Sequence, residues 1–171
     1  REIGFAPDRG NVKRGECRLQ LDQVSCGSDR GTPGLRGVGL EVCAGEILGI
    51  AGVSGNGQRE LAETITGLRK ITNGRVILEG QDVTGFAPGD LTDRMLAYIP
   101  EERMRDGMIK NFSVAENLIL REHHKQPFSR SGFLNLRDIA GHADKLIAKF
   151  QVKTPSHDTL AKNLSGGNIQ K

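Results

Sequence analysis

A glycine-rich turn between an apolar run and a helical repeat constrains the fold of this 171-residue chain most strongly. Residues 46–51 (EILGIA) form a short, nearly continuous apolar run, which is typical of a strand buried on both faces of a parallel sheet. Residues 52–57 are rich in glycine, and Leu61, Ile65 and Leu68 then mark one face of a helix. The order of strand, glycine turn and helix predicts an α/β core.

Residues 52–59 (GVSGNGQR) match the glycine skeleton of the phosphate-binding motif GxxxxGK[ST]. Glycines let successive backbone N–H groups point inwards as an anion nest, and the following helix adds the positive end of its dipole. The main chain of this loop can therefore hold a phosphate. A tight strand-to-helix turn, with glycines for left-handed backbone geometry, is the alternative explanation. The residues assigned to nucleotide contact are Gly52, Ser54, Gly55, Asn56, Gly57, Gln58 and Arg59.

Two side chains that phosphoryl transfer requires are absent from this loop. Gln58 stands where the motif has the lysine that neutralises the β- and γ-phosphates, and Arg59 stands where it has the hydroxyl that binds magnesium. Because catalysis depends on positive charge around the moving phosphoryl group, we expect little hydrolysis here and assign no catalytic residue. Arg59 can bring a charge to a phosphate, but its planar fork does not replace a magnesium ligand.

The periodicity of the first two thirds of the chain predicts an arm followed by a core. Residues 1–15 have neither helix nor strand period and predict a linker or arm. Residues 16–110 contain alternating apolar positions, which predict an antiparallel β layer, followed by the glycine loop. Two further strand candidates occupy residues 75–79 and 95–99, and Pro100 stops the second.

The last third of the chain, residues 111–171, predicts a helical subdomain. Ser113 and Glu116 have the spacing of a capping box, which opens a short helix. Apolar residues between 136 and 150 then recur at helical intervals and predict a longer amphipathic helix. The loop at 127–132 is the segment that we expect to be most mobile.

Composition excludes several classes of function. The longest apolar runs fall well short of the roughly 18 residues that cross a bilayer, so any membrane role is predicted to be peripheral. Lysine and arginine are interspersed with acidic residues and the net charge is only +3, which gives no indication of nucleic-acid binding. Three cysteines without CxxC spacing predict neither a disulfide framework nor a zinc site, and the four histidines are no site candidates.

Residues 164–171 (LSGGNIQK) carry a second candidate site. They resemble the LSGG[QN] signature of ABC ATPases, and Ser165 follows Gln58 by 107 positions, a spacing that suits this family. In the family, the serine hydroxyl and the glycine amides lie at a helix N-terminus and close over the γ-phosphate held by the opposite domain. A serine that simply caps a helix behind a glycine turn is the alternative. The resemblance assigns the phosphate contact to Ser165, Gly166, Gly167 and Asn168.

A larger part of the chain, roughly residues 17–171, resembles the second nucleotide-binding domain of the tandem ATPase subunit in bacterial simple-sugar and nucleoside importers. The resemblance implies an ABC-type P-loop NTPase fold: an antiparallel β layer, a partial parallel α/β core and a helical subdomain. It also implies a lysine-free phosphate loop in this domain and a competent loop in its partner domain. The resemblance rests on residues 44–61, 98–109, 112–120 and 150–171.

The resemblance implies a function in which ATP binding and hydrolysis are coupled to the uptake of a sugar or a nucleoside. The implied partners are a catalytic nucleotide-binding domain and transmembrane permease subunits, which the helical section and residues 100–108 would contact at the cytoplasmic face of the membrane. ATP and Mg²⁺ are the implied cofactors, bound weakly or through the partner.

Two other functions are alternatives to this one. An autonomous soluble P-loop nucleotide hydrolase would need a lysine and a hydroxyl residue after Gly57 and a downstream acidic strand. A dinucleotide-binding fold would need the glycines of residues 52–57 in the register GxGxxG, which they lack.

The chain also departs from the family pattern. The family has a glutamine after the strand at 95–99, where this chain has PEER, and Glu101 is a weak candidate for the equivalent contact with metal. Pairing of Glu101 with Arg103 or Arg105 is the favoured explanation. The aromatic residue that stacks on adenine is replaced by residues 26–28 (CGS).

The sequence stops at Lys171, before the strand that carries the magnesium aspartate and the catalytic glutamate in this family. We therefore expect an incomplete domain with an unpaired apolar sheet edge beside residues 47–51.

Overall fold

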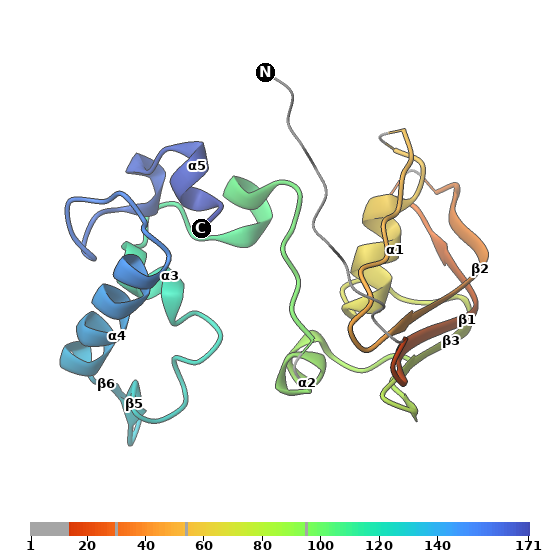
Figure 1. The fold of residues 1–171 in the computed structure, drawn as a ribbon, viewed down its shortest axis with the longest axis horizontal. Helices are drawn as coiled ribbons and strands as arrows, with labels where there is room; N and C mark the ends of the chain where they lie inside the picture. The colour runs from red at the N-terminus through yellow and green to blue at the C-terminus, as the bar shows by residue number, and fades with distance from the viewer. Residues whose placement is uncertain (1–13, 30, 54, 95) are drawn as a thin grey trace. The chain divides into compact units, whose positions relative to one another are not determined.

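The computed structural model describes residues 14–29, 31–53, 55–94 and 96–171. Most of the predicted arm lies outside these described residues, as do Ser54 and Met95. The chain folds as two compact units, Arg1–Tyr98 and Ile99–Lys171. Figure 1 shows the β-rich first unit in red to green and the helical second unit in green to blue.

A four-stranded antiparallel sheet forms the basis of the first unit. Its strands are β1 (Cys17–Gly27), β2 (Pro33–Cys43), β3 (Asn73–Leu78) and β4 (Gln81–Asp82). They lie in the order β2-β1-β3-β4. Leu21 on β1 lies opposite Leu40 on one side and Val76 on the other, so the apolar positions of the three strands share a face. The predicted antiparallel layer is confirmed.

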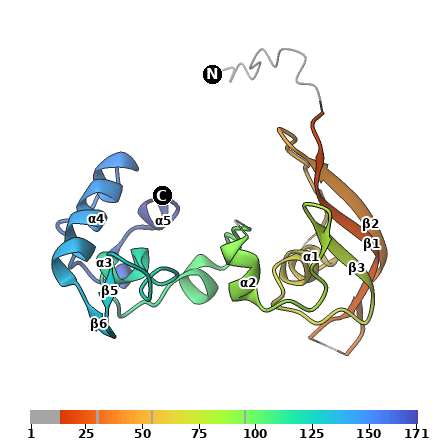
Figure 2. The same ribbon diagram turned by 90° about the horizontal axis from the view of Figure 1, so that it is seen from below.

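Helix α1 (Gln58–Ile65) covers this apolar face of the sheet (Figure 2). Leu61 projects from α1 into a buried cluster with Leu21 and Val24 of β1, and Thr64 is buried beside them. Leu91 of the short helix α2 (Pro88–Asp93) joins the same cluster. The first unit therefore has a core of its own, and the predicted helix after the glycine loop is confirmed.

Two predicted strands do not form. Residues 46–51 are irregular, with Ile47 83% and Ile50 56% exposed, and residues 96–99 are irregular as well, with Ile99 82% exposed. A strand requires a neighbour that accepts and donates its ladder hydrogen bonds, and the four strands of the sheet pair only with one another among the described residues. Apolar character alone therefore gave a wrong prediction at both places.

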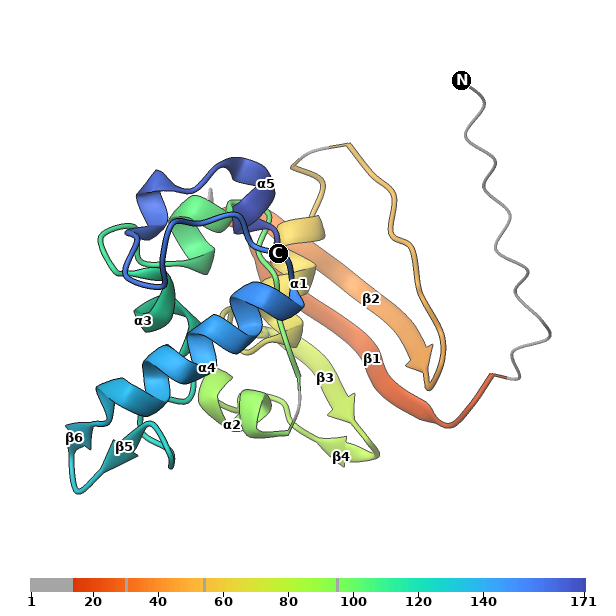
Figure 3. The same ribbon diagram turned by 60° about the vertical axis from the view of Figure 1, so that its left-hand side comes forward.

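The second unit begins with two short helices, which are followed by a β-hairpin. The π-helix η1 (Arg103–Gly107) is followed by α3 (Val114–Leu118). The hairpin of β5 (Ser129–Arg130) and β6 (Phe133–Leu134) occupies most of the loop that we expected to be mobile. Figure 3 shows this hairpin at one end of the helical unit.

Helix α4 (Leu136–Lys149) is the amphipathic helix that the apolar repeat predicted. Ile139 and Ala143 of α4 pack against Ala115 of α3, against Ile119 directly after α3 and against Phe128. The 3₁₀ helix η2 (Ala161–Asn163) and the short helix α5 (Gly166–Ile169) complete the unit. Within the described part of the chain, every helix is too short or too polar to span a bilayer.

The capping box at the start of α3 is confirmed in full. The Ser113 hydroxyl oxygen accepts from the Glu116 backbone N–H at 3.1 Å, and the Glu116 carboxylate accepts from the Ser113 backbone N–H at 2.7 Å. The chain also accepts from the two N–H groups between them, because Val114 donates to the Thr159 carbonyl and Ala115 donates to the His157 carbonyl. The first turn of α3 is therefore fully satisfied by its own chain.

Candidate functional site

The glycine loop ends directly at the start of α1, as the sequence predicts. Gly57 is the N-cap residue with φ 98°, and Gly55 has φ 88°. Both angles lie in the left-handed region, where glycine is favoured over residues with a Cβ. A Cβ on Gly57 would also approach the Gly34 carbonyl oxygen to 3.0 Å. The loop therefore needs glycine at these two positions for its own geometry.

Gln58 folds back over the beginning of the loop. Its side-chain Nε2 donates to the Val53 carbonyl at 3.2 Å, and a Cβ on residue 52 would collide with the same amide group. The Asn56 backbone N–H donates to the same carbonyl oxygen at 3.2 Å. Gln58 thus braces the loop with a neutral amide at the position where the motif places a cation, and Gly52 leaves room for it.

Arg59 lies in a network of ions along α1. Its Nε donates to Glu63 at 2.7 Å, and its guanidinium lies 3.7 Å from Asp29. Arg69 bonds to the same two carboxylates, at 2.6 Å for Glu63 and 2.7 Å for Asp29, and also to the Gly27 carbonyl. Two carboxylates therefore balance the charges of two arginines, and the charge of Arg59 is offset by its neighbours.

The network shifts the pKa values of Asp29 and Arg69 in the directions expected of an ion pair. The hydrogen bond from Arg69 lowers the pKa of Asp29, and the hydrogen bond to Asp29 raises the pKa of Arg69. The i,i+4 spacing of Arg59 and Glu63 is visible in the sequence. The contributions of Asp29 and Arg69 are not, because the fold brings them to α1 from other segments.

The side chains of the loop do not fit a magnesium ion. Magnesium prefers oxygen ligands, whereas Arg59, at the position of the metal-binding hydroxyl, is a cation bonded to carboxylates. No three His, Cys, Asp or Glu side chains gather into a metal-binding group in the described residues. The three cysteines are free thiols, with Cys17 exposed and Cys26 and Cys43 buried.

The expected pairing of Glu101 with nearby arginines is replaced by other contacts of those arginines. Arg105 pairs with Asp106 at 2.8 Å. The Nη2 of Arg103 donates to the Gln170 side-chain oxygen at 2.8 Å, once that amide is turned to face it. Arg103 therefore connects η1 with the residue that follows α5.

The signature segment also lies at the start of a helix. Ser165 is the N-cap residue of α5, and Gly166 and Gly167 form the first positions of the helix. The Ser165 hydroxyl makes no capping bond to the backbone of α5, so this side chain does not have the simple capping role that is the alternative to the signature. Its oxygen instead accepts from the Asn168 side-chain amide at 3.0 Å.

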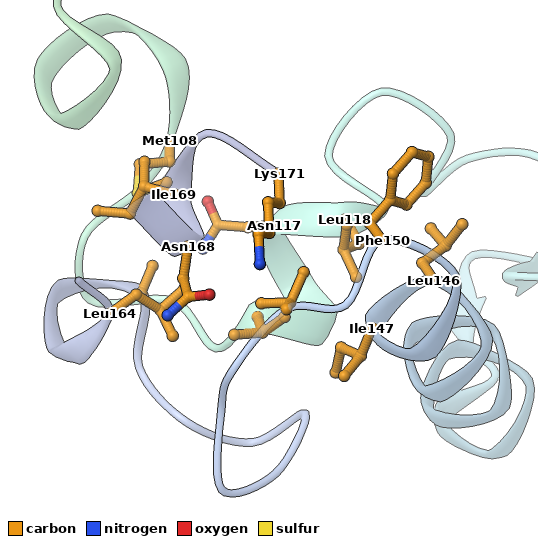
Figure 4. A pocket seen from close by; sticks show the side chains of 13 residues that line it. Met108, Asn117, Leu118, Leu146, Ile147, Phe150, Leu164, Asn168, Ile169 and Lys171 are labelled. Carbon is orange, nitrogen blue, oxygen red and sulfur yellow. The ribbon is translucent and has the colours of Figure 1, made fainter. Parts of the chain in front are cut away.

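An apolar cavity of about 110 Å³ lies beside α5, and sequence reasoning did not anticipate it. Side chains from the end of α4 form one wall, and Ile169 with Asn168 of α5 lies at another (Figure 4). The apolar lining residues include Met108, Leu118, Leu146, Ile147, Phe150 and Leu164.

The stretch at 26–28 offers no surface for stacking. Cys26 is 2% exposed and belongs to the core cluster of the first unit, where Thr64 donates a hydrogen bond to its sulfur. Ser28 bonds to Thr32 across the turn between β1 and β2. An aromatic base would therefore have no aromatic partner within this stretch.

A family model described as ABC transporter matches residues 35–171, which includes both glycine segments. The whole chain is 37% identical to the nucleoside import ATP-binding protein NupA of Lactococcus lactis and 38% identical to the guanosine import ATP-binding protein NupO of Bacillus subtilis. It is 39% identical to the glucose import ATP-binding protein TsgD13 of Haloferax volcanii. The chain spans about a third of the length of these relatives, 34%, 34% and 32% respectively.

Solved ATP-binding cassettes share the fold. The cassette MJ0796, in a dimeric post-hydrolysis state bound to ADP and Pi, superposes with a TM-score of 0.68 at 21% identity, over 89% of this chain and 65% of that one. The ADP conformation of MJ1267 superposes with a TM-score of 0.66 at 24% identity, over 91% of this chain and 61% of that one. The expected α/β fold of an ABC-type P-loop NTPase is thereby confirmed.

Proposed function

The chain belongs to the ABC transporter family, and from this premise we propose that it is a nucleotide-binding domain of an importer ATPase for a sugar or a nucleoside. More specifically, we propose that it is the second domain of a tandem subunit, whose partner domain performs hydrolysis. The names of the relatives support the solute classes, since NupA and NupO are nucleoside and guanosine import proteins and TsgD13 is a glucose import protein.

The observation that carries the proposal is the bond between the Gln58 amide and the Val53 carbonyl. In this proposal, the backbone N–H groups of Gly55 and Gly57 contribute to the anion nest, but the side chain at the lysine position is neutral and bonded within the loop. Arg59 is held by Glu63 and Asp29. The loop therefore binds the phosphates of a nucleotide weakly through its main chain, and it lacks the fixed cationic groups that phosphoryl transfer requires.

ATP supplies the phosphoryl group in this family, and Mg²⁺ neutralises its charge when bound at a competent loop. The residues present here fit the nucleotide phosphates through main-chain donors and do not fit the metal. In the proposed arrangement, Ser165, Gly166 and Gly167 donate hydrogen bonds to the γ-phosphate of a nucleotide held by the partner domain. This chain then completes a catalytic site whose cationic groups belong to its partner.

Permease subunits are the second proposed partner. The helical unit and residues 100–108 are the proposed contact, and the domain is proposed to lie at the cytoplasmic face of the membrane as a peripheral component. The bond from Arg103 in η1 to Gln170, directly after α5, supports this proposal because it connects residues 100–108 with the end of the signature segment.

Calorimetric titration of the chain with ATP, with and without magnesium, tests the proposed loop. We expect weak binding that magnesium does not strengthen, and an increase of about tenfold or more in affinity in Gln58→Lys, because a hydrogen bond to a charged group contributes about 1.5–3 kcal/mol. Gln126→Lys in the second unit is the matched control: it makes the same substitution outside residues 52–59 and should leave the affinity unchanged.

Two results would contradict this assignment. Saturable, magnesium-dependent binding with ATP turnover by the unmodified chain would favour the autonomous P-loop hydrolase instead. An equal gain of affinity in Gln58→Lys and Gln126→Lys would show that general charge, and not the loop, determines nucleotide binding.

A further inference from the structure

Asn168 connects the signature serine to the turn that follows α4. Its side-chain Oδ1 accepts from the Lys153 backbone N–H at 2.9 Å, and its Nδ2 donates to the Ser165 hydroxyl oxygen at 3.0 Å. A backbone N–H can only donate, so this contact fixes which end of the amide faces Lys153. The Nδ2 group can also only donate, so the Ser165 oxygen must be the acceptor.

The direction of these bonds leaves the hydroxyl proton of Ser165 available. A serine hydroxyl has one donor and two acceptor sites, and Asn168 uses one of the acceptor sites. The side chain makes no capping bond, and Ser165 is exposed. Its O–H group can therefore donate to a group from outside the chain.

Gly166 and Gly167 give an independent indication that such a group approaches closely. A Cβ on either residue would have no atom within 4 Å, and neither residue has a left-handed φ. The described chain therefore does not require glycine at these positions, although glycine is less favourable than alanine in a helix. No described residue accepts a hydrogen bond from the backbone N–H of either glycine.

Asn168 is held at both ends of its amide within the chain. Both ends of its amide are bonded, and the side chain lies at the rim of the apolar cavity beside Leu164 and Ile169 (Figure 4). A second bond, from the Lys171 Nζ to the Gln151 carbonyl at 2.7 Å, holds the residues after α5 to the same turn. These bonds place Asn168 to orient Ser165, in addition to the phosphate contact that the resemblance assigns to it.

We propose that Asn168 is a positioning residue, which presents the hydroxyl proton of Ser165 to the terminal phosphate of a nucleoside triphosphate held by a partner domain. The proposal rests on the proposed function for the source of that phosphate. Phosphate oxygens only accept, so a serine fixed as a donor binds them without first reorienting. An aspartate at position 168 would reverse the direction of this hydrogen bond. Its carboxylate would accept from the Ser165 hydroxyl, which would then no longer donate to a phosphate.

The geometric part of the proposal is tested on the isolated chain by NMR of the Asn168 side-chain amide. We expect one amide proton to shift and to exchange faster in Ser165→Ala, because that variant removes its acceptor. An unchanged amide signal in Ser165→Ala would overturn the assigned bond, whatever the function of the protein.

The functional part is tested by a double-mutant cycle on ATP-dependent association of the chain with a hydrolysis-deficient partner cassette that keeps the phosphate-loop lysine. Ser165→Ala should weaken association about tenfold or more, as expected when a hydrogen bond to a charged group is lost. Asn168→Ala should weaken it less in the native chain and by less than about twofold in the Ser165→Ala background, because its effect acts through the serine.

Asn168→Asp should weaken association more than Asn168→Ala. Asn163→Asp on η2 is the matched control: it adds the same charge close to α5 without contacting Ser165, and it should cause the smaller loss. Equal losses of association in Asn168→Asp and Asn163→Asp would contradict the proposed reversal of the hydrogen bond between residue 168 and the Ser165 hydroxyl.

The outcomes separate this proposal from the proposed function. Loss of association in Ser165→Ala, with the same further loss from Asn168→Ala in both backgrounds, would contradict the positioning role alone. Unchanged association in Ser165→Ala would contradict the proposed function and this proposal together.

Discussion

Two helices of the second unit begin at a serine and carry a polar residue three positions later, yet their starts differ. At α3, Ser113 and Glu116 form a reciprocal capping box, and the carbonyls of His157 and Thr159 accept the two remaining N–H groups. At α5, the Ser165 hydroxyl makes no capping bond. The same spacing in the sequence therefore produces two different arrangements.

The difference separates residues that the fold requires from residues that it does not. Every donor at the start of α3 is used within the chain, so its sequence is explained by stability alone. The two glycines of α5 are exposed and sterically unconstrained, and the Ser165 side chain is exposed. Glycine weakens a helix, and the described chain gives no structural reason for two glycines here. A contact with another molecule would explain them, which is why we place the functional contact at α5 and not at α3.

The largest expected effect contrasts a glycine that the fold requires with one that it does not. Gly67 has φ 72°, and a Cβ there would lie 2.5 Å from the Phe86 carbonyl oxygen. Gly67→Ala should lower the free energy of unfolding by about 2 kcal/mol or more, through backbone strain and this clash. Gly167→Ala should raise it by a few tenths to about 1 kcal/mol, because alanine favours the helix. Urea unfolding followed by circular dichroism measures both.

A loss of stability in Gly167→Ala similar to that in Gly67→Ala would break the comparison. It would show that the fold needs glycine in α5 for a reason that its sterics do not reveal.

The serine pair is expected to show the next largest effect. Ser113→Ala should lower the free energy of unfolding by about 1–2 kcal/mol, because it removes the cap of α3. Ser165→Ala should lower it by less than about 0.5 kcal/mol, because it removes one exposed hydrogen bond with Asn168 and no helix cap. Ser113→Thr, which keeps a capping hydroxyl, is the control in the same urea titration and should stay close to the native chain. Equal losses from the two alanine substitutions would contradict the assigned difference between the helix starts.

A smaller effect is expected in residues 157–159, where two backbone carbonyls accept hydrogen bonds from the first turn of α3. His157 bonds to Asp144 of α4 at 2.8 Å, and this hydrogen bond raises the pKa of His157 above its usual value. A raised folded-state pKa means that the contribution to stability is fully present below about pH 6.5 and is lost as the pH rises through the folded-state pKa. NMR titration of the His157 ring should give that raised pKa, and Asp144→Asn should return it towards the ordinary value.

The pH dependence bears on the comparison of the two helix starts because the His157 carbonyl accepts from the Ala115 N–H at the start of α3. An unchanged pKa in Asp144→Asn would remove this ion pair from the set of contacts that fix the start of α3.

Local spacing predicted the helix starts well. Gly57, Ser113 and Ser165 were each placed at the beginning of a helix from short motifs, and each is an N-cap residue in the structure. These features depend on residues within about one helical turn, which the sequence displays directly. The antiparallel layer was predicted for a similar reason, since alternation is a local property of each strand.

Features that depend on distant partners were not predicted. Residues 46–51 have the composition of a buried strand, but a strand exists only where another strand pairs with it. The engagement of Arg59 depends on Asp29, which the fold brings to α1 from the β1–β2 turn. The bond from Lys153 to Asn168 depends on the turn after α4, where Gln151 takes a positive φ of 53°. None of these partners can be identified from spacing alone.

The most direct test of the account is to locate the contact with a partner's nucleotide on the labelled chain. ¹⁵N NMR spectra of the chain would be recorded with the hydrolysis-deficient partner cassette in the presence of ATP and, separately, ADP. The account predicts that the amide signals of Gly166 and Gly167 shift most, and only with ATP, because the terminal phosphate accepts from their N–H groups. Shifts confined to residues 52–59, or equal shifts with ATP and ADP at Gly166 and Gly167, would contradict it.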